Sequence, residues 1–328
     1  MNSLGNVSIS DAIDRYILSI NLARSVNTAR TYKNGMSLFL LTLTEHKLDL
    51  ENLLVAELGE EPVSWFAARL KDYSPATERL YLTALAGFYD YIAGENLAEV
   101  NLPRIRLLIH QRARRPGIRL PQFPQNDLDT LLQKISDLHT CIAVDEEERL
   151  RNLRDRAFLI TLADTGLRVH EACGMRRGDL DRNEGRAIVI GKGNQQAVVR
   201  FSRRAQAALD DYLRARAALD GASGRPLSSL PLFARHDPGA GKKVKPITTA
   251  TGRNIVNQRV AEFLGNDLVG RITPHSFRHY FVTRVLQTSG NLKLAQELAR
   301  HKNIAVTQRY AHLSDNELDK GYWNAIEE

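Results

Sequence analysis

The sequence predicts a mainly α-helical protein of two domains, in which a helical bundle precedes a larger helical domain with a small β-hairpin. Three observations lead to this prediction. Residues 1–100 combine helix-start signals with apolar residues at helical spacing. The clear strand signals are 187–190 (AIVI) and 198–201 (VVRF), which flank GKGNQQ and predict a hairpin. A chain of 328 residues can bury two hydrophobic cores.

The first hundred residues contain four or five candidate helices, one of them a short helix over 63–70. Their starts are marked by capping residues and, in one case, by a following proline: Ser8 or Ser10, Asn27 or Thr28, and Ser74–Pro75. The helix after Ser74 carries an apolar stripe that we expect to be buried: Leu80, Leu85, Phe88 and Ile92. Helices without strands predict a small bundle.

The charge of the chain is unevenly distributed. The whole sequence has a formal charge of +7 and a pI near 9.4, which favours an acidic partner. Residues 1–100 hold 8 Lys and Arg against 13 Asp and Glu, so they carry −5 and the remainder carries +12. This acidity argues against a general DNA-binding surface on the first domain. A local stripe of Arg30, Lys33 and Arg79 could meet a DNA backbone, although an ordinary solvated face explains it equally well.

Residues 103–124 have the composition of a domain connection. They contain six arginines, four prolines and no acidic residue, which predicts an extended linker. The expected organisation is therefore a first domain over 1–103, a basic linker over 104–124 and a second domain over 125–328. Arginines so dense favour contact with phosphates, with Arg112, Arg114 and Arg115 as candidates, over a purely solubilising role.

Composition also bounds the cellular setting. The two cysteines, Cys141 and Cys173, lack the spacing of a metal site, which fits a reducing compartment. No run approaches the roughly 18 apolar residues of a membrane span, and the N-terminus lacks the pattern of a signal peptide. We expect a soluble cytoplasmic protein.

The segment 273–310 concentrates the residues that can do chemistry. Thr273 can cap a helix whose first residue is Pro274, and His275 and Arg278 then share one face near an N-terminus suited to a phosphate. Gly290 can end this helix, and a second helix carries Leu294 and Leu298 up to His301. Tyr310 follows nine residues later. A cation, imidazoles and a phenol around an anion site suggest phosphoryl transfer to tyrosine.

Two further candidates are weak on their own evidence. Arg168 follows the predicted helix stop at Gly166, and Glu171 could orient it, although an ordinary surface ion pair is the simpler interpretation. Lys192 lies near the hairpin tip in a GKG sequence that lacks the spacing of a P-loop.

Metal chemistry finds little support in the sequence. His275 and His279 have the i, i+4 spacing of a zinc helix, but the glutamate of that motif is missing. No acidic cluster suited to two metal ions is recognisable either. We therefore expect no cofactor.

Taken together, these segments resemble the tyrosine recombinase family, which includes Xer-type recombinases and phage integrases. TGLRVHE resembles its first arginine box, VIGKGN its lysine hairpin, TPHSFRHYFVTRVL its HxxR box, and LARHKNIAVTQRYAHL its final box. Residues 8–100 resemble the helical, SAM-like core-binding domain of the family. Three departures stand out: Arg300 replaces a usual glycine, Gln195 and Gln196 replace charged residues, and the first domain is acidic.

The resemblance implies a role for each matching residue. Tyr310 would be the nucleophile, Arg168 and Arg278 would hold the scissile phosphate, and His301 would support it. His275 and Lys192 would transfer protons. The implied reaction is metal- and ATP-independent cleavage and rejoining of DNA through a 3′-phosphotyrosine. The implied alternatives are a non-catalytic DNA-binding or regulatory protein on the same scaffold, and a type IB topoisomerase-like activity.

The resemblance also implies partners and a location. Family members close around double-stranded DNA as a C-shaped clamp and act as tetramers on paired sites. They pass a C-terminal helix to a neighbouring protomer, a role that the tail after Tyr310 could play. A second recombinase or an accessory factor could take part. The expected location is the nucleoid of a bacterial or archaeal cell.

Overall fold

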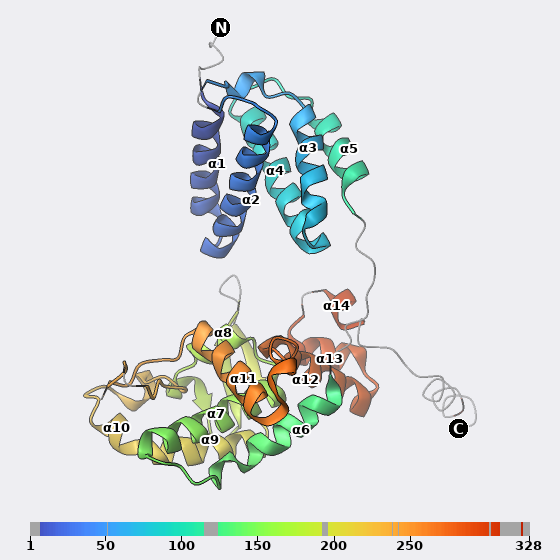
Figure 1. The fold of residues 1–328 in the computed structure, drawn as a ribbon. Coiled ribbons are helices and arrows are strands. Elements are labelled where there is room, and N and C mark those ends of the chain that lie inside the picture. The colour runs from blue at the N-terminus through green and yellow to red at the C-terminus, as the bar shows by residue number, and fades with distance from the viewer. Residues whose placement is uncertain are drawn as a thin grey trace. The chain divides into compact units, whose positions relative to one another are not determined.

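A computed structural model describes residues 7–50, 52–114, 124–191, 196–237, 239–241, 243–301, 303–308 and 323. The chain divides into two compact units, Met1–Arg119 and Leu120–Glu328, each with its own hydrophobic core (Figure 1). In the described residues, no helix has the length and apolar character needed to cross a membrane.

The first unit is a helical bundle, as predicted. Its described α-helices are α1 (Ile9–Ala23), α2 (Val26–Glu45), α3 (Glu61–Arg69), α4 (Pro75–Gly94) and α5 (Leu102–Arg112). The hydroxyls of Ser8 and Ser74 cap α1 and α4, accepting from backbone N–H groups three residues on. Ser25, rather than Asn27 or Thr28, caps α2 in the same way.

The core of the first unit is rich in aromatic side chains. The ring centroids of Tyr16 in α1 and Phe88 in α4 lie 5.7 Å apart. The Tyr16 hydroxyl donates to the carbonyl of Ala84 at 3.0 Å. Gly87 makes this approach possible, because a Cβ there would lie 2.4 Å from the Tyr16 hydroxyl. Leu80, expected in the buried stripe, is 42% exposed because Leu82 faces the core instead.

The extended linker predicted over 103–124 is wrong in its first part. Residues 102–112 form α5, in which Ile105 is 1% exposed and packs in the core of the first unit. Asn101 caps this helix by accepting from the N–H of Arg104 at 3.1 Å, and Pro103 lies in its first turn. Pro103 is the second residue of α5, where the backbone N–H that proline lacks would have no intrahelical partner, so it does not interrupt the helix. Residues 115–123 lie outside the described part.

A buried carboxylate ties the end of α5 to the bundle. Glu78 of α4 accepts from the ammonium of Lys71 at 2.7 Å, from the N–H of Arg114 at 2.9 Å and from the Arg114 guanidinium. Arg114 also donates to the carbonyls of Leu70 and Tyr73. Burial would raise the pKa of Glu78, but the hydrogen bonds from Lys71 and Arg114 lower it. The first unit thus continues at least to residue 114.

The second unit is helical with a small antiparallel sheet, as predicted. Its described α-helices are α6 (Gln125–Ser136), α7 (Glu146–Thr165), α8 (Val169–Gly174), α9 (Arg203–Ala215), α10 (Ala217–Gly221), α11 (Thr249–Leu264), α12 (Pro274–Ser289), α13 (Leu292–Ala299) and α14 (Ile304–Gln308). The strands β1 (Leu180–Asp181), β2 (Arg186–Ile190) and β3 (Gln196–Arg200) lie in the order β1-β2-β3, and Ile188 pairs with Val198.

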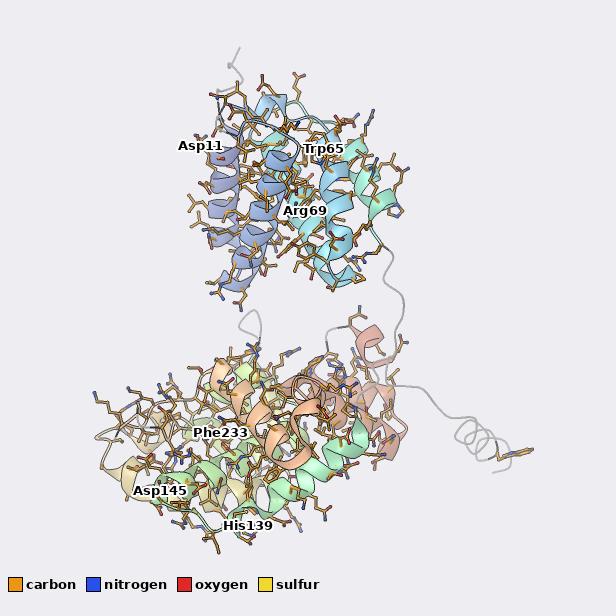
Figure 2. The ribbon with its side chains drawn as sticks, in the orientation of Figure 1. Asp11, Trp65, Arg69, His139, Asp145 and Phe233 are labelled. Carbon is orange, nitrogen blue, oxygen red and sulfur yellow. The ribbon has the colours of Figure 1, made fainter. Side chains whose placement is uncertain are left out.

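The core of the second unit surrounds α7. The rings of Phe158 in α7 and Phe233 pack edge to face, with their centroids 5.1 Å apart. Figure 2 labels Phe233 within this unit. Helix α11 approaches closely at Gly252, where a Cβ would lie 2.9 Å from Val169 and 3.0 Å from Phe158 and Cys173. This contact holds α11 beside α8, the helix that carries the residues after Arg168.

Candidate active site

The end of α7 places Arg168 at the start of α8. Gly166 ends α7 with φ +59°, in the left-handed region that favours glycine, which confirms the predicted helix stop. The next residue, Leu167, is buried, and Arg168 then serves as the N-cap residue of α8. Its side chain is 43% exposed, so its guanidinium can reach a ligand.

Glu171 orients Arg168. Its carboxylate accepts from the N–H of Arg168 at 2.9 Å and from the Arg168 guanidinium at 2.9 Å. The same carboxylate accepts from Arg300 at 3.0 Å. Burial alone would raise the pKa of Glu171, but the hydrogen bond from the Arg168 backbone and the charge of Arg300 lower it. Glu171 is therefore ionised at neutral pH, and its contact with Arg168 is more than a surface ion pair.

Arg278 is held inside the second unit. Helix α12 begins at Pro274 after Thr273, whose N–H donates to the Ser276 hydroxyl at 3.0 Å. Arg278, one turn into the helix, is 3% exposed and donates to the carbonyls of Gly166 and Ala299. Its guanidinium thus joins the ends of α7 and α13, and both arginines lie around the Gly166 turn.

Three histidines gather beside these arginines. The rings of His275 and His279 stack edge to face at 4.3 Å on α12. Burial, followed by the charges of Arg278 and Arg168, lowers the pKa of His275. Burial, followed by His275 and His301, lowers the pKa of His279 to about 4. At neutral pH both rings are uncharged, so each can accept a proton.

His301 follows α13 and belongs to the same electrostatic cluster. The Nδ1 of its ring lies 2.9 Å from the hydroxyl of Thr307 in α14, and its backbone N–H donates to the carbonyl of Gln296. Burial, followed by the charges of Arg278 and Arg168, lowers the pKa of His301 to about 4. The imidazole is therefore neutral at pH 7 and can donate one hydrogen bond to an anion.

Arg168, His275 and Arg278 line one pocket. It has a volume of about 440 Å³ and is lined by Arg168, Arg253, Asn257, His275 and Arg278, among others. Among the described residues that line it there is no Asp or Glu. Guanidinium groups from three separate elements around one cavity make a site for an anion with several oxygens, such as a phosphodiester.

Comparison with known families decides what this pocket belongs to. The phage integrase family matches residues 125–317, and the phage integrase N-terminal SAM-like domain matches residues 13–96. The chain belongs to the phage integrase family. It is a tyrosine recombinase, an enzyme of site-specific DNA recombination.

Individual relatives agree with this assignment. The recombinase is 28% identical over 299 residues to tyrosine recombinase XerC of Thermodesulfovibrio yellowstonii, covering 91% of this chain and 89% of the relative. It is 29% identical over 303 residues to XerC of Treponema denticola, covering 91% and 92%.

Solved structures share the fold. The Tn1549 transposon integrase in complex with transposon right end DNA has a TM-score of 0.66 at 17% identity, covering 97% of this chain and 99% of that one. The XerH recombinase bound to its difH substrate has a TM-score of 0.65 at 20% identity, covering 97% and 84%.

The structure brings four of the six expected catalytic residues of the recombinase into one region: Arg168, His275, Arg278 and His301. Lys192 and Tyr310 lie outside the described residues, although β2 and β3 bracket the first and α14 ends two residues before the second.

The predicted DNA contacts are spread over the first unit and its end. Arg30 and Lys33 on α2, Arg79 on α4 and Arg112 on α5 are exposed. Arg114 is instead bonded to Glu78 within the first unit, and Arg115 lies outside the described residues.

The sequence analysis does not point to two residues of this region, or to one contact of a third. Arg253 and Asn257 line the pocket from α11, one turn apart, and their spacing alone carries no signal because it fits any exposed helix face. Arg300 was recognised as a departure from the family pattern, but its bond to Glu171, 129 residues away, was not foreseeable from local sequence.

Proposed function

We propose that this recombinase cleaves one DNA strand by attack of the Tyr310 hydroxyl oxygen on the scissile phosphorus. The phosphorus–tyrosine bond forms, the bond to the 5′-oxygen breaks, and the leaving 5′-oxygen takes up a proton to become a hydroxyl. Attack of a second 5′-hydroxyl on the 3′-phosphotyrosine then rejoins the strand. Because the covalent intermediate conserves the energy of the phosphodiester bond, the reaction consumes no ATP.

The observation that carries this proposal is the convergence of Arg168, His275 and Arg278 on one pocket without acidic lining residues among those described. Negative charge grows on the non-bridging oxygens as tyrosine attacks, and guanidinium groups already in place stabilise it without reorganising. Arg168 is oriented by Glu171, and Arg278 is fixed by two carbonyls. Such pre-organised donors are what phosphoryl transfer requires.

The lowered pKa of His275 supports a role as proton acceptor for the phenol. A tyrosine with an ordinary pKa near 10 is a poor nucleophile at neutral pH and needs a base or a cationic surrounding. His275 is neutral because burial, Arg278 and Arg168 lower its pKa, so it can take that proton. Arrival of a phosphate anion would raise this pKa again, which favours the protonated ring as cleavage proceeds.

We assign the remaining roles to His301 and Lys192. His301 is neutral and close to Thr307, which supports its use as a hydrogen-bond donor to the phosphate. Lys192, between β2 and β3, would protonate the departing 5′-oxygen.

Covalent trapping tests the proposal. Sheared genomic DNA incubated with the protein and then denatured should yield protein–DNA adducts, and sequencing of these adducts identifies the cleavage site. A duplex of that site, nicked so that the cleaved end diffuses away, should then accumulate adduct with the wild-type protein. Tyr310→Phe should bind the duplex but form none. Adduct formation by Tyr310→Phe, or its absence with the wild-type protein, would refute the mechanism.

The same reagents separate the alternatives. A non-catalytic DNA-binding protein would shift the duplex without any adduct. A topoisomerase-like enzyme would relax supercoiled plasmids that lack the mapped site. Relaxation confined to plasmids with the site, together with strand exchange between two such sites, supports the recombinase.

We further propose that four protomers assemble on paired sites and exchange the tail after Tyr310, and that a second recombinase or an accessory factor can join them. In the first domain, Arg30, Lys33, Arg79 and Arg112 are the proposed backbone contacts. Because the protein acts on DNA, we expect it in the cytoplasm at the nucleoid of a bacterial or archaeal cell. Removal of residues 311–328 should leave binding of one duplex intact and abolish the slower complex that contains two duplexes.

A further inference from the structure

Arg300 adopts a backbone conformation that an arginine rarely takes. It ends α13 with φ +58° and ψ +45°, in the left-handed region. Among the described residues it shares a positive φ with only two other non-glycine residues, Lys47 and Asn96. A side chain in this region costs roughly 1 kcal/mol relative to glycine, so something specific to Arg300 has to offset the strain.

The compensating contact is the ion pair with Glu171. The Arg300 guanidinium lies 3.0 Å from the Glu171 carboxylate, and the Arg300 side chain is 13% exposed. The Arg168 guanidinium lies 2.9 Å from the other oxygen of the same carboxylate. Two guanidinium groups therefore share one buried carboxylate, with a net charge of +1. Burial, with some repulsion from Arg168, lowers the pKa of Arg300, whereas Glu171 opposes this shift.

Arg300 is placed to act through Glu171 and not directly on a bound phosphate. Arg168, Arg253 and Arg278 line the 440 Å³ pocket, whereas Arg300 does not. The Arg300 Nε is buried and has no hydrogen-bond partner among the described residues, so this side chain is engaged through its outer nitrogen alone. Arg168, by contrast, is 43% exposed.

The contact from Arg300 through Glu171 to Arg168, called the bridge below, joins Arg168 to the part of the chain that leads to Tyr310. Arg300 precedes His301, and the segment after it continues through α14 toward Tyr310. The carbonyl of Ala299, one residue before Arg300, accepts from Arg278. The end of α13 is thus attached to Arg278 by a hydrogen bond from the Arg278 guanidinium to the Ala299 carbonyl, and to Arg168, through Glu171, by the Arg300 side chain.

We propose that Arg300 is a positioning residue for DNA cleavage, which fixes Arg168 through Glu171 and thereby couples the nucleophile-bearing segment to the phosphate-binding arginines. This proposal rests on the recombinase mechanism proposed above. Arg300 restrains the carboxylate that orients Arg168; without Arg300, Glu171 keeps its hydrogen bonds to Arg168 but is no longer held by the end of α13.

A double-mutant cycle on the cleavage rate tests the coupling, with the nicked duplex of the mapped site as the probe. Arg300→Gly removes the bridge and relieves the backbone strain, so we expect an unchanged or higher melting temperature, unchanged duplex affinity and a single-turnover cleavage rate about tenfold lower. Arg300→Lys keeps one hydrogen bond to Glu171 and should restore part of the rate. Glu171→Gln with Arg300→Gly should cleave no more slowly than Glu171→Gln alone.

Lys47→Gly is the matched control. Lys47 has φ +64° in the first unit, far from the pocket in sequence, so the change relieves the same kind of strain and should leave cleavage at the wild-type rate.

The outcomes separate the two proposals. If the wild-type protein forms no adduct, the mechanism itself fails. If the wild-type protein forms adduct and Arg300→Gly matches its rate, or if the two single effects multiply in the double variant, the coupling through Glu171 is refuted while the mechanism stands.

Discussion

Replacing Arg278 with alanine should damage both the fold and the chemistry, and the structure separates the two effects. The Arg278 guanidinium donates to the carbonyls of Gly166 and Ala299 in a site where only 3% of the residue is exposed. Losing a partner leaves each buried carbonyl unsatisfied at a cost of about 1–3 kcal/mol. The free energy of unfolding should thus fall by about 3 kcal/mol, which lowers the melting temperature by about 6–12 °C.

The chemical effect should be larger. Removing one pre-organised donor to a developing oxyanion typically slows a reaction about 10²- to 10³-fold. We therefore expect Arg278→Ala to cleave the nicked duplex at least a hundredfold more slowly, measured in single turnover at a temperature where the variant is folded. Duplex affinity should change little, because many other contacts supply binding.

Arg214→Ala provides the control for this experiment. Arg214 is exposed on α9 and pairs with Asp211 at 2.7 Å, a kind of contact that contributes little to stability. The Arg214→Ala protein should have the melting temperature and the cleavage rate of the wild-type protein. Equal losses of binding and cleavage in folded Arg278→Ala, or a wild-type melting temperature, would show that the role given to Arg278 is wrong.

Three further predictions concern the fold around the site. Gly166→Ala should lower the melting temperature of the second unit and slow cleavage, because φ is +59° and the new Cβ would lie 2.5 Å from the Phe281 ring; a wild-type rate would refute the link between this turn and the site. Ile105→Ala should destabilise the first unit by about 2–5 kcal/mol in tryptophan-fluorescence unfolding, whereas exposed Leu107→Ala on the same helix should not. Burial lowers the pKa of His279 and His301 from 6.5 to about 4, so the unfolded state binds more protons between these values and stability should fall as pH drops from 7 to 4. In melting curves against pH, His301→Asn should show a shallower fall than the wild-type protein, and an equal slope would contradict the assignment.

Much of the fold follows from local sequence signals. Ser8, Ser74 and Gly166 act as the caps that their residue types suggest, because capping depends on the few residues around each helix end. The hairpin of β2 and β3 is recognisable because two short runs rich in Ile and Val, AIVI and VVRF, flank the turn-like sequence GKGNQQ.

The errors arise where tertiary contacts decide. The segment after Asn101 contains prolines and arginines, yet it is helical because Ile105 finds a place in the core of the first unit. Leu80 and Leu82 both fit a helical stripe, and only the packing of α4 against α1 and α2 decides which one is buried.

The candidate site divides in the same way. His275 and Arg278 lie within one helical turn, so their proximity can be predicted from spacing. The meeting of Arg168 with Arg300 through Glu171 joins positions more than a hundred residues apart, and no local pattern encodes it. The residues that can take part in the reaction are therefore predictable at each motif, whereas the contacts between motifs depend on the tertiary structure.

The close packing of α11 at Gly252 limits which substitutions this enzyme can accept. A single methyl group added at residue 252 would press on Val169, Phe158 and Cys173 at once, so α11 could accept it only by moving away from α8, the helix that follows Arg168. Substitutions on α11 should therefore be tolerated more readily at pocket-lining residues such as Arg253 and Asn257 than at residue 252, where the helix lies against its neighbours.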